Sequence, residues 1–354
     1  MSVFYGIHIL RCVGPGGVNR GRNGEQKTIT IGRSVRVRHS CYSEKAAIRE
    51  FFKAKYAAMS KQSRKWVEWI ENELTHGKIP AEEAGKWARG IMSKFMGHKE
   101  EKEKKAQETG KKPKKAVVVR LFPEEIKQLE DVIQGIIKGE ITSVDSIKFT
   151  HRGIAYDLAS TGRMLPTRIP GAISVGHTFG IDRMSNEMDF FIAQDDMARD
   201  SMNDQDDKEI DGAAHLANID ISSNPVYNFS LINRDQVVRN LDGDEKAVIQ
   251  AMQDHLEAMA MSGASSRSTN GAHTRTLASY ILVERTEHMP YSLCDAFFVP
   301  ASTIDEGIER LRSLRKAQIE GYGLEDSCQE FSIVLKNGKF IRQGSLADLK
   351  EFIK

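Results

Sequence analysis

The sequence predicts an α+β fold that carries a helical insertion at residues 50–150. Two observations predict this class. Strand-like stretches are separated by helix-like ones without the regular spacing of βαβ units. Helical periodicity is concentrated inside the insertion, over 64–96 and again after Pro123. With 354 residues, the chain is long enough for one large domain with insertions or for two domains.

The first forty residues predict two strands joined by a loop. Residues 3–10 (VFYGIHIL) are rich in β-forming side chains, and we expect His8 to be a packing residue with satisfied hydrogen bonds. The stretch 14–27 is rich in Gly, Pro and Asn, which is typical of a loop. Residues 28–39 alternate, and we expect one strand whose Val35 and Val37 are buried while Arg36 and Arg38 form a basic face.

An amphipathic helix is predicted next. Ser40 or Ser43 can cap it. Lys45, Arg49 and Lys53 recur every four residues, so they share one side of the helix. Its apolar stripe consists of Ala47, Ile48, Phe51 and Phe52.

The rest of the chain alternates between helical, extended and irregular stretches. The low-complexity tract 98–115 predicts a charged loop. Residues 212–232 are typical of a β-hairpin, and 278–284 predict a strand. Helices are expected at about 243–261 and 303–319.

Composition excludes several classes of protein. No apolar run approaches the roughly 20 residues of a membrane helix, so we expect no membrane partner. The N-terminus lacks the basic region and the cleavage site of a signal peptide, and we expect a strand there instead. The cysteines are scattered without metal-ligand spacing, which disfavours a zinc site or a disulfide framework and favours a cytoplasmic location. They are Cys12, Cys41, Cys294 and Cys328. We expect no metal and no cofactor.

The small net charge of +2 hides an asymmetry. Basic residues dominate up to position 50, where only Glu25, Glu44 and Glu50 oppose them. Acidic residues dominate 195–211, where only Arg199 and Lys208 oppose them. A basic end and an acidic segment would orient the chain on a polyanion.

Several stretches, taken in order, resemble one family. They are NRGRNGEQK at 19–27, GRSVRVRHSCYSEKAAIR at 32–49, DLASTGRM at 157–164, AISVGHTFGIDRMSNEMDFFIAQDD at 172–196, GAAHL at 212–216 and GYGLEDSCQEFS at 321–332. The ordered set is similar to the CasC backbone subunit of the type I-E CRISPR Cascade complex, whereas the insertion at 50–150 matches only weakly.

The resemblance implies a hand-like architecture. Its palm would be an RNA-recognition-motif (ferredoxin-like) domain formed by 1–50 and 217–354 together with 140–163. Residues 51–139 would be helical fingers, and 164–216 would be a β-hairpin thumb. Copies of the chain would stack along a guide RNA, and each thumb would displace a nucleotide at regular intervals.

The resemblance also assigns RNA-binding residues. Arg20 and Lys27 match an RNA-contacting loop, where small neighbours let basic side chains approach a phosphate. Ser40, Tyr42, Lys45 and Arg49 match the strand-to-helix junction, whose helix N-terminus favours anions. The family usually has Gln where this chain has Tyr42.

Three apolar residues and one arginine complete the expected site. Met164, Phe191 and Leu216 match wedges that separate nucleotides, and stacking tolerates any base. Arg267 matches a loop that carries a basic residue beside the RNA backbone. On periodicity alone each apolar residue would be assigned to a core.

The resemblance implies a non-catalytic function. The expected partners are a CRISPR guide RNA, target DNA paired with that guide, further copies of the chain and other Cascade subunits. An alternative stays open, because related type III backbone subunits cleave RNA with a thumb aspartate, and Asp195, Asp196 and Asp200 could hold Mg²⁺. A free-standing RNA-binding protein is disfavoured, because no aromatic RNP-like box is present.

Overall fold

The computed structural model describes residues 2–22, 24–56, 59–97, 118–151, 153, 155–194, 213–264 and 275–354. It has a mixed α+β architecture with a large antiparallel sheet, so the predicted α+β class is confirmed. The chain divides into two compact units. The first contains 1–51, 174–233 and 252–354, and the second contains 52–173 and 234–251. The palm, finger and thumb boundaries expected from the sequence stay a prediction.

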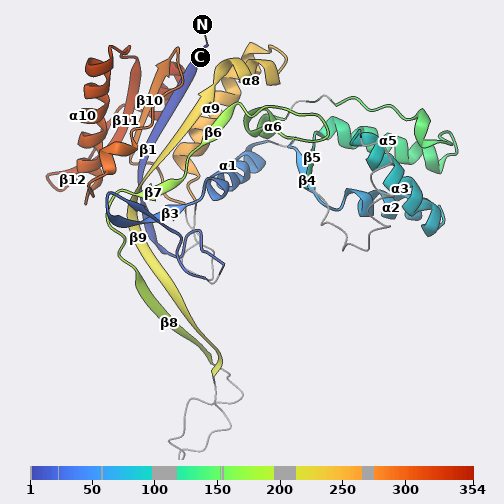
Figure 1. Cartoon of the computed structure of the whole chain (residues 1–354), viewed down its shortest axis with the longest axis horizontal. Coiled ribbons are helices and arrows are strands. Elements are labelled where there is room, and N and C mark those ends of the chain that lie inside the picture. The colour runs from blue at the N-terminus through green and yellow to red at the C-terminus, as the bar shows by residue number, and fades with distance from the viewer. Residues whose placement is uncertain are drawn as a thin grey trace, which may run out of the picture. The chain divides into compact units, whose positions relative to one another are not determined.

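A ten-stranded sheet forms the first unit (Figure 1). Its central strand β1 (Phe4–Gly16) pairs antiparallel with β9 on one side and β10 on the other, so that Ile7 lies opposite Ser230 and Val283. The order along the sheet is β12 (Lys339–Gln343), β11 (Cys328–Lys336), β10 (Tyr280–Thr286), β1, β9 (Ala213–Asn233), β7 (Thr178–Gly180), β3 (Ser34–His39) and β2 (Thr28–Ile31). Strand β1 is therefore an interior strand of the sheet, paired along both of its edges.

Helix α10 (Ile304–Tyr322) covers one face of this sheet (Figure 1). Its buried Ile308 and Leu311 belong to a cluster with Leu10, Tyr280 and Leu282 from the strands. Thr303 caps the helix by accepting a hydrogen bond from the Glu306 amide at 3.1 Å, and a left-handed Gly323 ends it. The unit also contains the 3₁₀ turn η3 (Cys294–Phe297), α11 (Leu346–Phe352) and the part of α9 (Glu245–Met261) from Met252 onward.

His8 lies inside the first unit and is fully buried. Its Nδ1 is 2.9 Å from the Tyr227 hydroxyl, and its Nε2 is 3.2 Å from Glu284 Oε1. Both ring nitrogens therefore have partners. The expectation that His8 is a satisfied packing residue is confirmed.

The prediction of a single strand over 28–39 is wrong, because these residues form the hairpin β2–β3. Gly32 and Arg33, with φ of 54° and 65°, make its two-residue turn. A Cβ on Gly32 would lie 1.6 Å from the Phe298 carbonyl oxygen, so only glycine fits there.

The predicted faces of 34–39 are also wrong in part. Val37 is buried as expected, but Val35 is 52% exposed and Arg36 is fully buried. The Arg36 guanidinium donates to the carbonyl oxygens of Ile181 and Phe297. Adjacent residues of a strand point to opposite faces, so both faces of β3 are buried at Arg36 and Val37, which alternation alone does not indicate.

The sequence predicts that residues 212–232 form both strands of one β-hairpin, and this prediction is wrong. They lie in the single 21-residue strand β9. Its first part pairs with β8 (Glu187–Gln194), and its later part pairs with β1. Figure 1 shows β8 and β9 extending together as a two-stranded ribbon beyond the rest of this sheet. The short strand β6 (Ile173–Val175) also pairs with β9.

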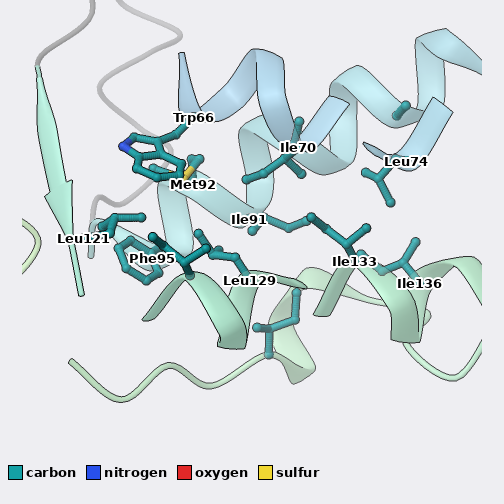
Figure 2. Packing of buried hydrophobic residues seen from close by; sticks show 14 of the residues in the cluster. Trp66, Ile70, Leu74, Ile91, Met92, Phe95, Leu121, Leu129, Ile133 and Ile136 are labelled. Carbon is teal, nitrogen blue, oxygen red and sulfur yellow. The ribbon is translucent and has the colours of Figure 1, made fainter. Parts of the chain in front are cut away.

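The second unit has a helical core of its own (Figure 2). Trp66, Ile70 and Leu74 from one helix meet Ile91, Met92 and Phe95 from another and Leu129, Ile133 and Ile136 from a third. These helices are α2 (Trp66–His76), α3 (Ala81–Phe95) and α5 (Pro123–Ile137). The predicted helical insertion is therefore confirmed, while its low-complexity tract 98–115 lies outside the described residues.

Short elements complete the second unit. They are the strand pair β4 (Lys61–Ser63) and β5 (Val119–Leu121), the 3₁₀ turn η1 (Val144–Ser146), α6 (Tyr156–Thr161) and α8 (Arg234–Asn240). No helix among the residues with described structure is both long and apolar enough to cross a membrane.

We predict that Leu129→Ala lowers the free energy of unfolding by about 2–5 kcal/mol, because a large buried side chain leaves a cavity. Leu129 is fully buried, whereas its neighbour Glu130 on the same helix is exposed. Glu130→Ala should therefore change stability by less than about 0.5 kcal/mol. Urea denaturation of both variants measures the difference, and equal losses would contradict this assignment of the core.

Candidate nucleic-acid interface

The loop 17–27 is attached to the start of helix α1 (Cys41–Lys55) by one side chain. Asn19 adopts a left-handed backbone with φ of 54°, which asparagine tolerates better than most residues. Its Oδ1 accepts a hydrogen bond from the Ser40 amide at 2.8 Å. The loop is closed further by an antiparallel bridge between Arg20 and Gln26. The loop and the helix start therefore form one local structure.

Arg20 and Lys27 occupy different positions in this local structure. Arg20 Nη2 donates to the Asp220 carbonyl oxygen at 3.0 Å, while its Nε is buried without a hydrogen-bond partner. Lys27 lies at the end of the loop, and its carbonyl oxygen accepts from the Arg38 amide at 2.8 Å. Both side chains are half-buried. Arg20 thus anchors the loop to β9 through one end of its guanidinium group.

Helix α1 begins with two caps. Ser40 Oγ accepts from the Ser43 amide at 3.3 Å, which confirms Ser40 as the predicted cap. His177 Nδ1 accepts from the Cys41 amide at 3.1 Å and lies 3.4 Å from Arg38 Nη1. Because both of these groups can only donate, His177 Nδ1 must carry a lone pair and the neutral ring holds its proton on Nε2.

A buried carboxylate lies beneath the first turn of α1. Glu44 accepts from Thr178 Oγ1 at 2.7 Å and from the Ala264 amide at 3.3 Å, and its Oε1 is 3.5 Å from His39 Nδ1. Burial on its own would raise the pKa of Glu44. The combined effect of His39, Arg11 and Thr178 is larger, so the pKa lies below the ordinary value of 4.5. Glu44 is therefore ionised at neutral pH.

The exposed part of α1 carries the remaining predicted residues. Lys45 and Arg49 are half-buried and lie one turn apart, and Tyr42 is 79% exposed in the first turn. The helix N-terminus adds a partial positive charge, which the ionised Glu44 partly offsets. The structure thus brings together Arg20, Lys27, Ser40, Tyr42, Lys45 and Arg49 around one loop and one helix start.

Met164 lies in the second unit, directly after Arg163, in the turn that the bridged residues Arg163 and Ile169 enclose. Its side chain is 84% exposed. The turn follows α6, whose C-cap Gly162 has φ of 69° and lies too close to the Ile169 carbonyl oxygen for a Cβ. A core position for Met164 is therefore ruled out.

Arg163 holds this turn in place. It makes two hydrogen bonds to the fully buried Glu125, at 2.5 and 2.7 Å, and its guanidinium lies 4.6 Å from the centre of the Phe122 ring. It also donates to the Thr167 hydroxyl at 3.1 Å. A bidentate, buried ion pair of this kind fixes geometry as well as charge. Met164 is therefore an apolar side chain presented on a rigid turn.

The other predicted wedge residues lie in the ribbon. Phe191 of β8 pairs with Ala217, and Leu216 of β9 pairs with Ile192, so the two occupy neighbouring positions of the register. Arg267 lies outside the described residues, as do Asp195, Asp196 and Asp200. Within the described ranges, no group of three or more His, Cys, Asp or Glu side chains could hold a metal ion.

Sequence reasoning missed three residues that shape the interface. Asn19, His177 and Glu44 fix the loop and the helix start by hydrogen bonds. Asn19 had a usable signal, because asparagine in a Gly-rich loop favours a left-handed backbone. His177 is remote in sequence from α1, so no local pattern could have identified its role.

The chain was compared with known families and structures. The family model described as CT1975-like protein matches residues 6–353. One chain of a structure described as a CRISPR RNA-guided surveillance complex, pre-nicking, superposes with a TM-score of 0.73 at 21% identity, covering 95% of this chain and 93% of the other. A chain of a second structure, described as a CRISPR RNA-guided surveillance complex, superposes with a TM-score of 0.64 at 18% sequence identity. This match covers 98% of the present chain and 94% of the other. No curated protein matches the chain. At these identities the structural matches establish the fold.

We predict that the stabilising effect of Glu44 is lost in acid. Since folding lowers its pKa, ionised Glu44 stabilises the protein above its unfolded pKa of about 4.5, and this contribution disappears as the pH falls through the lower folded value. Glu44→Gln should cost about 1–3 kcal/mol at pH 7 and progressively less below pH 4.5.

Urea denaturation across this pH range measures the effect, with Glu287→Gln as the control because Glu287 is exposed in the same unit. The control variant should have the same free energy of unfolding as the unmodified protein at every pH. A stability difference for Glu44→Gln that stays constant or widens in acid would contradict the assignment.

Proposed function

The chain belongs to the CT1975-like protein family, and from this we propose that it is a backbone subunit of a CRISPR surveillance complex that binds guide RNA. One observation carries the proposal: a hydrogen bond from the Ser40 amide to Asn19 joins loop 17–27 to the start of α1. This contact gathers the basic residues of the N-terminal region in one place. The likeness of its fold to chains of solved surveillance complexes supports the same function.

In this proposal the cations of the first unit neutralise the sugar-phosphate backbone. Lys45 and Arg49 supply charge from one side of α1, and Lys27 supplies it from the loop. Arg20 contributes the part of its guanidinium that is not bonded to β9. Such contacts carry no sequence information, which suits a protein that must hold any guide. Tyr42, exposed in the first turn, would stack on a base or donate a hydrogen bond.

Met164 supports a second element of the proposal, a wedge that displaces nucleotides. It is exposed on a turn that the Arg163–Glu125 pair holds in place. An apolar side chain on an anchored turn can enter between bases without further ordering of the backbone that carries it. Phe191 and Leu216, from the β8–β9 ribbon, are proposed to act in the same way, and Arg267 is proposed to contact the backbone.

The finer assignment rests on the sequence resemblance to type I-E CasC. It adds a palm related to the RNA-recognition motif, assembly of copies along the guide in the cytoplasm, and contacts with other Cascade subunits and with target DNA through the guide. No bond is made or broken by the chain itself in this proposal. Its work is to neutralise phosphates and to impose a repeated geometry on the RNA.

We expect Lys45→Ala combined with Arg49→Ala to weaken binding of single-stranded RNA by about tenfold or more at roughly 0.1 M salt. The slope of log affinity against log salt should become shallower by about 1.4, since each phosphate contact to a single strand contributes about 0.7. Oligouridylate and oligoadenylate should lose affinity equally, because the contacts are to phosphate. Fluorescence anisotropy at several salt concentrations measures all three quantities.

The matched control removes two positive charges at the opposite end of the same sheet, Lys336→Ala with Lys339→Ala. It should leave both the affinity for RNA and the salt slope unchanged. If it weakens binding as much as the α1 variant, only net charge matters and the interface is not at α1. Selective loss of one RNA sequence would instead indicate base readout.

We further expect complementary RNA to remain intact when it is incubated with the assembled, guide-loaded complex and Mg²⁺. Gel analysis of end-labelled RNA over time measures cleavage. Cuts at regular intervals that disappear with Asp195→Ala or Asp196→Ala, but persist with Asp220→Ala in β9, would assign the chain to the RNA-cleaving class and refute the non-catalytic proposal.

A further inference from the structure

The hairpin β11–β12 lies at the end of the large sheet opposite to β2. Asn337 and Gly338, with φ of 50° and 75°, form its two-residue turn, the type that best fits the twist of two strands. Among the strands of the described chain, β12 pairs only with β11. Its outer edge therefore presents backbone donors and acceptors that could pair with another strand.

An apolar patch lies on one face of this hairpin. Leu335 and Phe340 are directly opposite each other and are 53% and 76% exposed. Ile333, 38% exposed, lies opposite Arg342 two residues farther along the strands. Side chains at these alternating positions share a face. Exposed apolar side chains that cluster on an unpaired edge strand are a feature that monomeric proteins usually avoid.

In the part of the hairpin where β11 and β12 pair, residues 332–343, all charged side chains are positive. Lys336 and Lys339 lie directly opposite each other beside the turn, and Arg342 lies on β12. No acidic residue occurs between 333 and 343. Like charges at directly opposed positions destabilise a strand pair, so the two lysines reduce the stability of the isolated hairpin. An anionic group placed between them would remove this repulsion.

We propose that the β12 edge binds an extended segment of another protein, in which acidic residues alternate with apolar ones. The segment would add a strand beside β12, with its apolar residues on Leu335 and Phe340 and its carboxylates near Lys336 and Lys339. Strand addition supplies affinity through the main chain and specificity through alternate side chains. The five residues of β12 match a segment of about 17 Å. This inference does not depend on the RNA-binding function.

The chemistry of the patch favours a peptide over a nucleic acid. Bases stack on aromatic rings, and among the exposed residues of this patch, Ile333, Leu335 and Phe340, only Phe340 carries a ring, while the hairpin's other ring, that of Phe331, is half-buried. Aliphatic side chains and an open strand edge are complementary to another β-strand. The cations then select an acidic strand from among the extended peptides that could pair there.

The test is selection of a phage-displayed library of random peptides, each about eight residues long, on the full-length protein. Enriched peptides should alternate acidic and apolar residues. The enrichment should disappear with Phe340→Ser and with Lys336→Glu combined with Lys339→Glu. Tyr322→Ser is the matched control, because Tyr322 is an equally exposed aromatic residue, at 81%, on α10. This variant should retain the enrichment.

A synthetic copy of the enriched peptide should bind Phe340→Ser at least about tenfold more weakly than it binds the Tyr322→Ser control. Because Phe340 is exposed, its replacement should leave the circular dichroism spectrum unchanged. Three outcomes would overturn the proposal. The first is that no peptide is enriched, or that Phe340→Ser leaves the enrichment unchanged. The second is that the protein binds oligouridylate and that Phe340→Ser, but not Tyr322→Ser, abolishes this binding. The third is that light scattering shows self-association that depends on Phe340.

Discussion

The candidate interface depends on the buried carboxylate of Glu44. This side chain bonds to Thr178 of β7 and to the Ala264 amide, and it lies beside His39 at the end of β3. Segments distant in the sequence are thereby fixed at the first turn of α1. The backbone that carries the basic side chains of this interface is thereby held in one conformation. Electrostatic binding then requires little ordering of the backbone, which is the usual advantage of a preorganised site.

The second unit applies the same principle with different groups. The Arg163–Glu125 pair anchors the turn that presents Met164 to helix α5. Glu125 also caps α5 by accepting from the Phe122 amide at 2.9 Å. One carboxylate therefore links a helix start to an exposed turn. A buried ion pair of this kind is better explained by the geometry it enforces than by a gain in stability, because desolvation offsets most of its attraction.

Local patterns predicted the helices well and the arrangement of the strands less well. Ser40 as a cap, the stripe of Ile48 and Phe52 and the helices of the insertion all follow from nearby residues. Arg36 was placed on the surface, because nothing nearby shows that the carbonyl groups of Ile181 and Phe297 accept its protons. Residues 212–232 were predicted as a hairpin for the same reason, since their true partners, β8 and β1, are set by distant pairings. The basic residues of the candidate interface stay a prediction from the sequence resemblance, whereas Asn19 and His177, which fix the loop and the helix start, are seen only in the structure.

Strand β9 runs without interruption from the ribbon into the centre of the sheet. Its side-chain alternation is therefore set at the β1 end, where the core allows only one choice of face. Homologous chains cannot vary the reach of the ribbon freely. A single inserted residue would reverse every side chain beyond it or require a bulge, so uninterrupted lengthening proceeds by two residues in each strand, about 7 Å at a time. Unless a bulge absorbs the extra residue, as at the register shift between Ala193 and Gln194 in the β8–β9 ladder, the span of the ribbon changes only in two-residue steps.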